Sequence, residues 1–201
     1  MAITIPATNI GSEDNGCAVV TLLSTVAQQK VKNLQSELLQ ELNGSIWPMP
    51  TSSLHSTLCE IIQPKPYADD KAVMYAAHHD EYEAALVEVL SKYGPIRVVF
   101  NKIEASPQAI VIMGDDDGAF NQIRAELLKI LPFPVETKLP PDVVHSSIAR
   151  FIKEVDLQKV QETVARHSIL FEEIVTEFQF MYPIWPHLLH YEVVRRYLLA
   201  K

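Results

Sequence analysis

The chain has 201 residues, of which 48% are hydrophobic, and it carries a formal net charge of −8 at pH 7. This hydrophobic content supports a packed interior and excludes an intrinsically disordered chain. The negative charge opposes docking on a long polyanion, so extended binding to RNA or DNA is not expected, whereas a small phosphorylated ligand can still bind in a local cationic pocket.

The N-terminal segment, residues 1–16, is polar and is predicted to be a loose arm. It has no basic segment leading into an apolar one, so it does not resemble a secretory signal. No apolar stretch approaches the roughly 20 residues that a membrane span needs, and no membrane association is expected. Cys17 and Cys59 do not imply a disulfide framework, and we expect buried reduced thiols in a cytoplasmic protein. Residues 17–201 are predicted to form a single domain.

Period-two and helical patterns of apolar residues alternate along this domain. The predicted strands are 18–24, 54–62, 96–105, 109–113, 143–151, 171–182 and 188–199. The predicted helices are 26–42, the later part of 67–93, a helix capped by 115–118 that runs to about 131, and 156–167. Most strands are connected by hairpins or single helices. This order is typical of an α+β fold with largely antiparallel sheets and helices on their outer faces.

The two halves of the domain contain a weak internal repeat. A strand, a helix and a proline-rich turn lead to Leu54-His-Ser-Thr-Leu58, and the same order leads to Val144-His-Ser-Ser-Ile148. The two proline-rich turns are Trp47–Pro50 and Leu139–Pro141. Each half therefore delivers a histidine and a hydroxyl residue, flanked by aliphatic residues, at the same point.

The spacing within each motif places its polar side chains together. Residues i and i+2 of a strand share a face, so His55 lies beside Thr57, and His145 lies beside Ser147. The aliphatic neighbours fall on the opposite face, towards the core. We therefore expect both polar pairs to face a cleft.

These side chains supply what cleavage of a phosphodiester needs without a metal. The reaction requires a base and an acid, and histidine can serve as either because it titrates near neutrality. The hydroxyls of Thr57 and Ser147 can donate hydrogen bonds to the non-bridging oxygens as charge builds there. We predict catalytic roles for His55 and His145 and expect no cofactor. Which histidine is the base stays open.

The two motifs resemble those of the 2H phosphoesterase superfamily, whose members are similar to bacterial 2′-5′ RNA ligases and 2′,3′-cyclic nucleotide phosphodiesterases. Trp47–Leu58 resembles the first family motif and Val144–Arg150 the second, and their histidines lie about ninety residues apart. The resemblance implies a bilobal fold with pseudo-twofold related lobes and a central groove between the motifs. It also implies a phosphate-binding role for Arg150, which would need a bulge or a strand end to face the groove.

Two positions depart from the family pattern. Ser56 stands where relatives commonly carry an apolar residue, and Ser147 stands where threonine is frequent. The predicted function is a metal-independent phosphoesterase acting on a 2′,3′-cyclic phosphate or on 2′-5′-linked nucleotide or RNA ends. The alternative is a non-catalytic nucleotide- or RNA-end-binding module, although binding alone does not require two titrating groups. A purely structural protein would leave both motifs unexplained.

Other polar clusters are better explained without a metal. His78–Glu81 projects its side chains in different directions on a helix, so a solvated helix start is favoured. Of His187, His190 and Glu192, only the last two share a strand face, which favours a structural or edge-strand role. The segment 115–118 resembles part of a calcium loop but lacks ligands at its first and last positions.

The remaining candidates are a thiol and three aromatic residues. By parity Cys59 shares the face of His55, but a catalytic thiol needs an activating partner, so a cleft-lining or packed cysteine is expected. The rings of Tyr67, Tyr182 and Trp185 could stack a base, and core packing explains them equally well.

Overall fold

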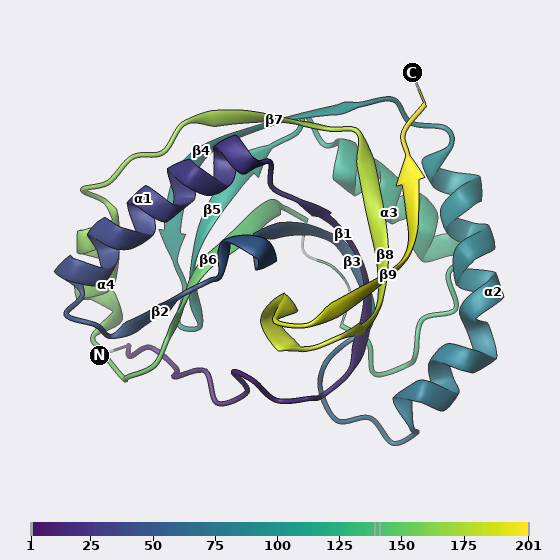
Figure 1. Ribbon diagram of the computed structural model, residues 1–201, viewed down its shortest axis with the longest axis horizontal. Coiled ribbons are helices and arrows are strands. Elements are labelled where there is room, and N and C mark those ends of the chain that lie inside the picture. The colour runs from purple at the N-terminus through teal and green to yellow at the C-terminus, as the bar shows by residue number, and fades with distance from the viewer. Residues whose placement is uncertain (1, 139, 141, 201) are drawn as a thin grey trace.

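The computed structural model describes residues 2–138, 140 and 142–200. Met1, Leu139, Pro141 and Lys201, which belong to the predicted arm, the second proline-rich turn and the end of the predicted domain, lie outside the described residues. The described chain combines helices with antiparallel sheets (Figure 1), which confirms the predicted α+β class. No helix in this part of the chain is both long and apolar enough to cross a membrane.

The elements follow the predicted order closely. The strands are β1 (Gly16–Leu22), β2 (Ile46–Pro48), β3 (His55–Ile62), β4 (Ile96–Ala105), β5 (Ala109–Asp115), β6 (Val144–Phe151), β7 (Phe171–Val175), β8 (Glu177–Ile184) and β9 (Tyr191–Leu198). The helices are α1 (Thr25–Glu41), α2 (Lys71–Leu90), α3 (Ala119–Ile130) and α4 (Leu157–Val164), with short 3-10 turns η1 (Thr51–Ser53) and η2 (Pro186–Leu188). Side-chain N-caps start three of the helices and satisfy their free backbone N–H groups: Ser24, Asp70 and Asp156.

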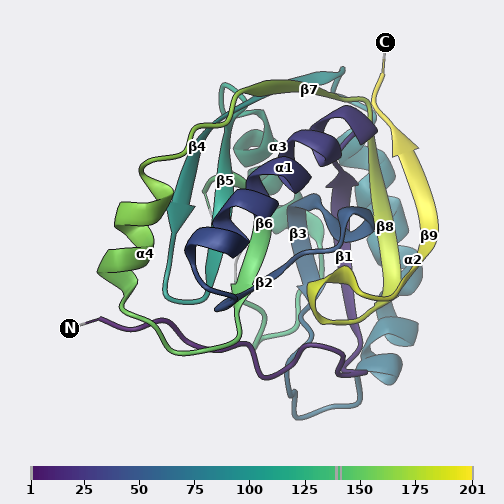
Figure 2. The same ribbon diagram turned by 60° about the vertical axis from the view of Figure 1, so that its left-hand side comes forward.

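The described strands form two antiparallel sheets. One has the order β3-β1-β8-β9 and the other the order β2-β6-β5-β4-β7, and Figure 2 shows the two series of strands side by side. The strands that carry the two motifs, β3 and β6, contact one another where the sheets meet. Both motifs therefore lie where the two sheets contact one another.

The predicted strand 171–182 is wrong as a single element. The chain crosses at Thr176, so that β7 pairs with β4 in one sheet and β8 pairs with β9 in the other. Figure 1 shows this crossing along the upper edge of the molecule. The sequence has no glycine or proline at Thr176, and the apolar pattern runs through this position, so the sequence does not predict the change of sheet. The predicted turn Trp47–Pro50 also contains a short strand, β2, which pairs with β6.

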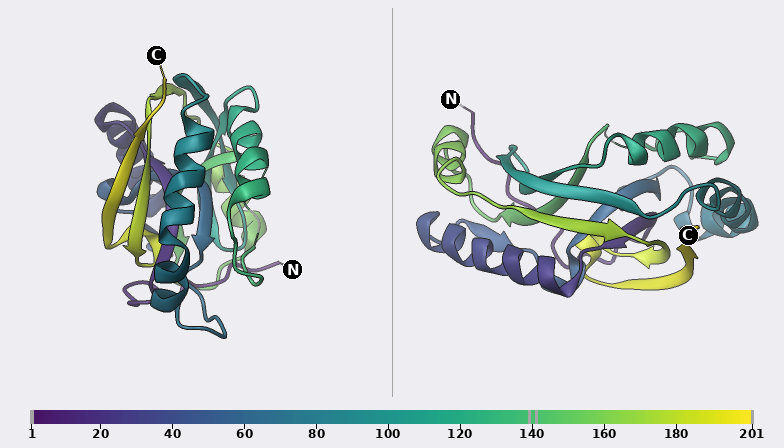
Figure 3. Two further views of the ribbon diagram at one scale, coloured as in Figure 1. Left: turned by 90° about the vertical axis from the view of Figure 1, so that its right-hand side faces the viewer. Right: turned by 90° about the horizontal axis from the view of Figure 1, so that it is seen from above.

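Each sheet is covered by one helix of its own half and one of the other half. The helix α1, which follows β1, packs against β2, β6 and β7, whereas α3, which follows β5, packs against β3. The remaining helices stay with their own sheets, α2 beside β9 and α4 beside β4. Figure 3 shows α1 with α4 at one end and α2 with α3 at the other. The exchange of α1 and α3 ties together the two lobes that the resemblance implied.

Both motif strands carry a β-bulge at the same place. In β3, Cys59 pairs with Val19 and Thr57 with Val20, so Leu58 has no partner on β1. In β6, Ala149 pairs with Ile110 and Ser147 with Val111, so Ile148 has no partner on β5. Each omitted residue lies three positions after the motif histidine. A bulge reverses the alternation of side chains, so the following residues change faces.

The helix that crosses from the other half binds each bulge. From α3, the Arg124 guanidinium donates from Nε to the Leu58 carbonyl at 2.9 Å. From α1, the Gln35 amide donates to the Ile148 carbonyl at 2.7 Å. Both side chains are buried, and both hold further carbonyls: Arg124 those of Thr57 and Val143, and Gln35 that of Met49. The backbone polarity exposed by each bulge is thus satisfied inside the protein.

The N-terminal arm is not loose, contrary to the sequence-based expectation. Thr4 bonds the Val155 carbonyl through its N–H at 2.9 Å, and its hydroxyl donates to the Lys153 carbonyl at 3.1 Å. Further along, the Ile5 and Ala7 N–H groups bond backbone carbonyls of the sheet region. Figures 1 and 2 show the purple arm running along the lower edge towards β1. The polar composition of the arm does not predict these contacts, because they use mainly backbone atoms.

Replacing Arg124 tests the importance of the bulge contacts. In the Arg124→Met protein, three buried carbonyls lose a charged donor, so we expect the free energy of unfolding to fall by about 3 kcal/mol or more. Urea denaturation measures this loss. The matched control is Arg97→Met, which removes an exposed pair with Glu172 and should cost less than about 1 kcal/mol. Equal stability of the two variants would contradict the structural role of Arg124.

Candidate active site

A cleft of about 680 Å³ opens over the two motif strands. Ligand sites for small molecules are typically about 300–1,000 Å³, so the cleft can hold a nucleotide. Its lining includes the five residues predicted from the sequence: His55, Thr57, His145, Ser147 and Arg150. The structure therefore brings together two imidazoles, two hydroxyls and a guanidinium from segments far apart in the chain.

The tautomer of His55 is fixed by the backbone. Its Nδ1 lies 2.6 Å from the Ser53 carbonyl oxygen, and because a carbonyl can only accept, Nδ1 must carry the proton. Burial lowers the pKa of His55 to about 4, assisted by the charges of His145 and Arg150 and opposed by the Ser53 hydrogen bond. At neutral pH the ring is uncharged, with Nε2 as its free acceptor.

His145 occupies the equivalent position in the other motif. Burial lowers its pKa, with the charges of Arg124 and Arg150 acting in the same direction and a hydrogen bond to the backbone of Val143 opposing them. Ser53 and Val143 each lie two residues before a motif histidine, so the two rings have similar backbone partners. An anion placed between the rings would raise both pKa values.

Arg150 faces the cleft because of the β6 bulge. Because Ile148 is the extra residue of this bulge, position 150 lies on the side of β6 that faces the cleft. The family resemblance implied that Arg150 would need such a bulge, or a strand end, to face the groove. Its Nη2 donates to the Ser147 hydroxyl at 3.2 Å. Among the described residues, no carboxylate lies within ion-pair distance of its guanidinium. A charged donor therefore remains free for an anionic ligand.

Glu60 is a cleft residue that the sequence reading missed. It lies five positions after His55, as Arg150 lies five positions after His145, and the bulge in β3 turns it towards the cleft. Burial raises the pKa of Glu60, whereas a hydrogen bond from Gln63 and the charges of Arg150 and Lys65 oppose this shift. Aligning the two motifs with each other would have identified this position.

His187 also lies in the cleft, and it is outside the strands, so the expected edge-strand position is wrong for this residue. It belongs to η2, between β8 and β9, and lines the cleft together with Trp185. Burial and the charges of Arg150 and His55 lower its pKa to about 4. Only the fold brings it there, because it lies 132 positions after His55 in the sequence.

The other candidates take structural positions. Cys59 is turned into the core by the bulge, so the parity argument was wrong and the packed alternative holds; burial raises its pKa to about 12. His78 and His79 lie within α2, and His79 pairs with Glu83 at 3.1 Å. In the described part of the chain, no three His, Cys, Asp or Glu residues are grouped to hold a metal ion. Tyr182 stacks on Tyr75 with ring centroids 3.6 Å apart.

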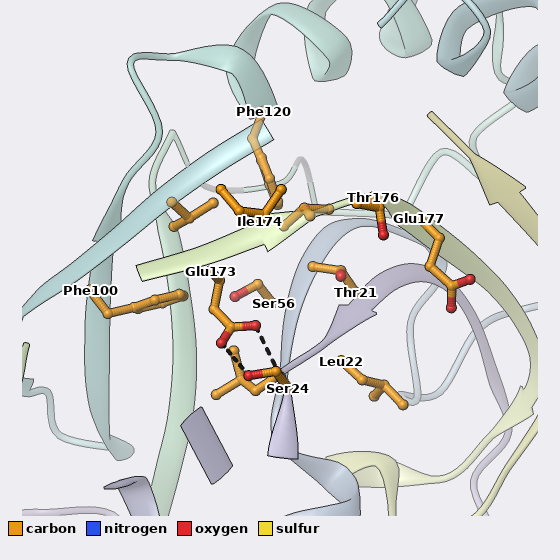
Figure 4. A pocket seen from close by; sticks show the side chains of 13 residues that line it. Thr21, Leu22, Ser24, Ser56, Phe100, Phe120, Glu173, Ile174, Thr176 and Glu177 are labelled. Carbon is orange, nitrogen blue, oxygen red and sulfur yellow. Dashed lines mark hydrogen bonds between the residues drawn. The ribbon is translucent and has the colours of Figure 1, made fainter. Parts of the chain in front are cut away.

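A second cavity, of about 140 Å³, lies behind β3 (Figure 4). Ser56, on the opposite face of the strand from His55, points into it beside Phe100 and Phe120. Ser24 closes one side by donating to the Glu173 carboxylate at 2.5 Å. The described residues that line this cavity include no histidine, lysine or arginine. It therefore lacks the features of an anion site.

The architecture is similar to solved structures of low sequence identity. The protein TT0787 of Thermus thermophilus matches with a TM-score of 0.65 at 18% identity, over 92% of this chain and 97% of that chain. E. coli LigT complexed with phosphate matches with a TM-score of 0.61 at 14% identity, over 94% and 100%. LigT complexed with 3′-AMP matches with a TM-score of 0.57 at 14% identity, over the same shares. These likenesses confirm the fold that the resemblance implied.

In sequence, no family model matches the chain and no curated protein matches it. The comparisons therefore show the fold alone.

The depressed pKa of His55 predicts how stability depends on pH. Between its unfolded pKa of 6.5 and its folded pKa of about 4, the unfolded chain binds the proton more strongly, so the free energy of unfolding should decrease as pH falls through this window. The full contribution is on the order of 3 kcal/mol. Urea denaturation from pH 7 to pH 4 measures it. The His55→Gln protein should show a shallower decrease, and the exposed-site control His190→Gln should follow the unmodified protein. Identical curves for all three proteins would contradict the burial effect.

Proposed function

We propose that this chain is a 2H phosphoesterase that acts on a 2′,3′-cyclic phosphate or on 2′-5′-linked nucleotide or RNA ends. The observation that carries the proposal is the convergence of two histidines, two hydroxyls and an arginine in one cleft, where Arg150 donates to the Ser147 hydroxyl. E. coli LigT has been crystallised with phosphate, with 3′-AMP, with ATP and with NADP+, which supports a nucleotide as the ligand here. We place the protein in the cytoplasm, in keeping with its two free, buried cysteines.

The residues have distinct roles in this proposal. Arg150, Thr57 and Ser147 bind the non-bridging oxygens of the phosphodiester and stabilise the charge that develops on them. In the hydrolytic direction His55 is the base, because it is neutral and its Nε2 is the free acceptor. His145, protonated when the anion raises its pKa, is the acid.

The chemical step is an in-line displacement. His55 Nε2 removes a proton from water as the water oxygen forms a bond to phosphorus. The bond from phosphorus to one ribose oxygen breaks, and His145 protonates that oxygen. The product is a ribose monophosphate, and the two histidines exchange roles in the reverse direction.

The proposal predicts activity in the presence of a chelator. Arg150 supplies the positive charge and the histidines transfer the protons, so hydrolysis of a 2′,3′-cyclic nucleotide should proceed at the same rate with and without EDTA. The measurement is the initial rate after extensive dialysis against EDTA. A loss of rate that added zinc or manganese restores would contradict the proposed mechanism.

Removing either histidine should abolish most turnover. Acid and base act in one displacement, so His55→Ala and His145→Ala should each lose at least about 10²-fold in kcat, and the double variant should be scarcely slower than either single one. Thr57→Ala removes one hydrogen bond and should lose less, about 10-fold. Steady-state kinetics measure these effects, with melting temperatures recorded beside them.

The matched control for Thr57→Ala is Ser56→Ala. Ser56 is the adjacent hydroxyl on β3, it faces away from the cleft, and within the described residues it has no hydrogen-bond partner. Its removal should leave kcat unchanged. Near-full activity in either folded histidine variant would show that these histidines are structural. Nucleotide binding without turnover in the unmodified protein would instead support a non-catalytic nucleotide- or RNA-end-binding module.

A further inference from the structure

The corner between β8 and β9 holds two successive residues in a backbone conformation that non-glycine residues rarely adopt. His187 has φ 63° and ψ 19°, and Leu188 has φ 53°. Such a conformation costs free energy and is maintained only when the surrounding structure enforces it, often at functional sites. Both residues line the cleft, and Leu188 also packs in a buried apolar cluster, which holds the corner in place.

The N-terminal arm fixes the protonation of this ring. His187 Nε2 lies 3.0 Å from the Asn9 side-chain oxygen, and because an amide oxygen can only accept, Nε2 must donate. The ring is neutral at pH 7, so Nδ1 is left as an acceptor. Within the described residues, Nδ1 has no hydrogen-bond partner. Figures 1 and 2 show the purple arm passing next to the yellow β8–β9 corner.

This acceptor lies next to the anion site but does not suit the anion. The Arg150 and His55 side chains are close enough for their charges to lower the His187 pKa. Phosphate oxygens are themselves acceptors at neutral pH, so they cannot bond a neutral Nδ1. Aromatic rings lie close to it: the ring of Trp47 lies 6.1 Å from that of His187, and Trp185, two positions before His187, lines the cleft. A hydrogen-bond donor on an organic group next to the phosphate matches these surroundings.

We propose that His187 is a specificity-determining residue that accepts a hydrogen bond from the nucleoside attached to the phosphate. The donor is either a sugar hydroxyl or a base N–H. This inference rests on the proposed function, and it assigns the organic part of the ligand to the Asn9–His187 side of the cleft. Phosphodiesters without such a donor lose this interaction, so the cleft selects nucleotides over simple diesters.

The test compares two substrates in the full-length protein. Adenosine 2′,3′-cyclic phosphate carries donors, and bis(4-nitrophenyl) phosphate carries none. His187→Phe keeps a ring but lacks the acceptor, so the ratio of kcat/KM for the nucleotide over the aryl diester should fall about 3- to 10-fold, mainly through KM. His187→Asn, whose side chain tolerates the left-handed backbone and keeps an acceptor, should retain most of the ratio.

A control variant distinguishes two roles of His187: binding of the nucleoside and attachment of the N-terminal arm through Asn9. Asn9→Ala removes the same hydrogen bond between arm and corner but leaves the imidazole in place, so it should change the ratio less than His187→Phe does. If Asn9→Ala reproduces the full effect of His187→Phe, His187 serves only to hold the arm, and the proposal is overturned. An unchanged ratio in folded His187→Phe overturns it as well.

Binding measurements keep this test independent of turnover. By calorimetry, His187→Phe should weaken 3′-AMP more than inorganic phosphate; equal weakening overturns the inference even if the protein is a phosphoesterase. Absence of turnover in the unmodified protein, with the binding difference intact, would reject the proposed function alone. The 3′-phosphate of purine riboside, which lacks the amino group, identifies the donor. Loss of the difference with this ligand assigns the base amine, and its persistence assigns a sugar hydroxyl.

Discussion

The cleft depends on how two backbone irregularities are satisfied inside the protein. A bulge leaves polar groups out of the sheet ladder, and burying them without partners would cost more than the fold can sustain. Arg124 and Gln35 supply the missing partners from helices that cross between the lobes. With the bulges stabilised in this way, β3 and β6 each present one further side chain to the cleft after the histidine–hydroxyl pair, namely Glu60 and Arg150. The arrangement of the cleft residues on β3 and β6 therefore depends on the packing of the crossing helices.

The Arg124 guanidinium acts both on the β3 bulge and on the pKa of a cleft imidazole. Arg124 lies close enough to His145 for its charge to help burial lower the pKa of that imidazole. His55 lacks an equivalent cation from α1, since its counterpart Gln35 is uncharged. Two motifs that look alike in sequence therefore sit in different electrostatic surroundings. This difference originates in the helices that cover the sheets and not in the motif strands.

Local patterns predicted the motif strands, the cleft-facing pairs and most helices, because strand parity and helical spacing act over a few residues. Strand alternation predicted the wrong face for Cys59 and Glu60, because one inserted residue reverses the faces of all later side chains. A bulge has no fixed sequence pattern that would have predicted this change. The change of sheet at Thr176 has no turn residue. His187 reaches the cleft through tertiary contacts and an unusual backbone conformation. The docking of the arm uses mainly backbone bonds, which composition does not reveal.

A strong chemical difference between the two motif strands is the exchange of a carboxyl for a guanidinium at equivalent positions, Glu60 and Arg150, both of which line the cleft. A site built from two similar halves would accept an elongated ligand in two opposite orientations with nearly equal energy. The Glu60 carboxyl from one motif strand and the Arg150 guanidinium from the other remove this degeneracy, and each charge acts on the pKa of the other group. A ligand with two unlike ends would therefore bind in one of these two orientations in preference to the other.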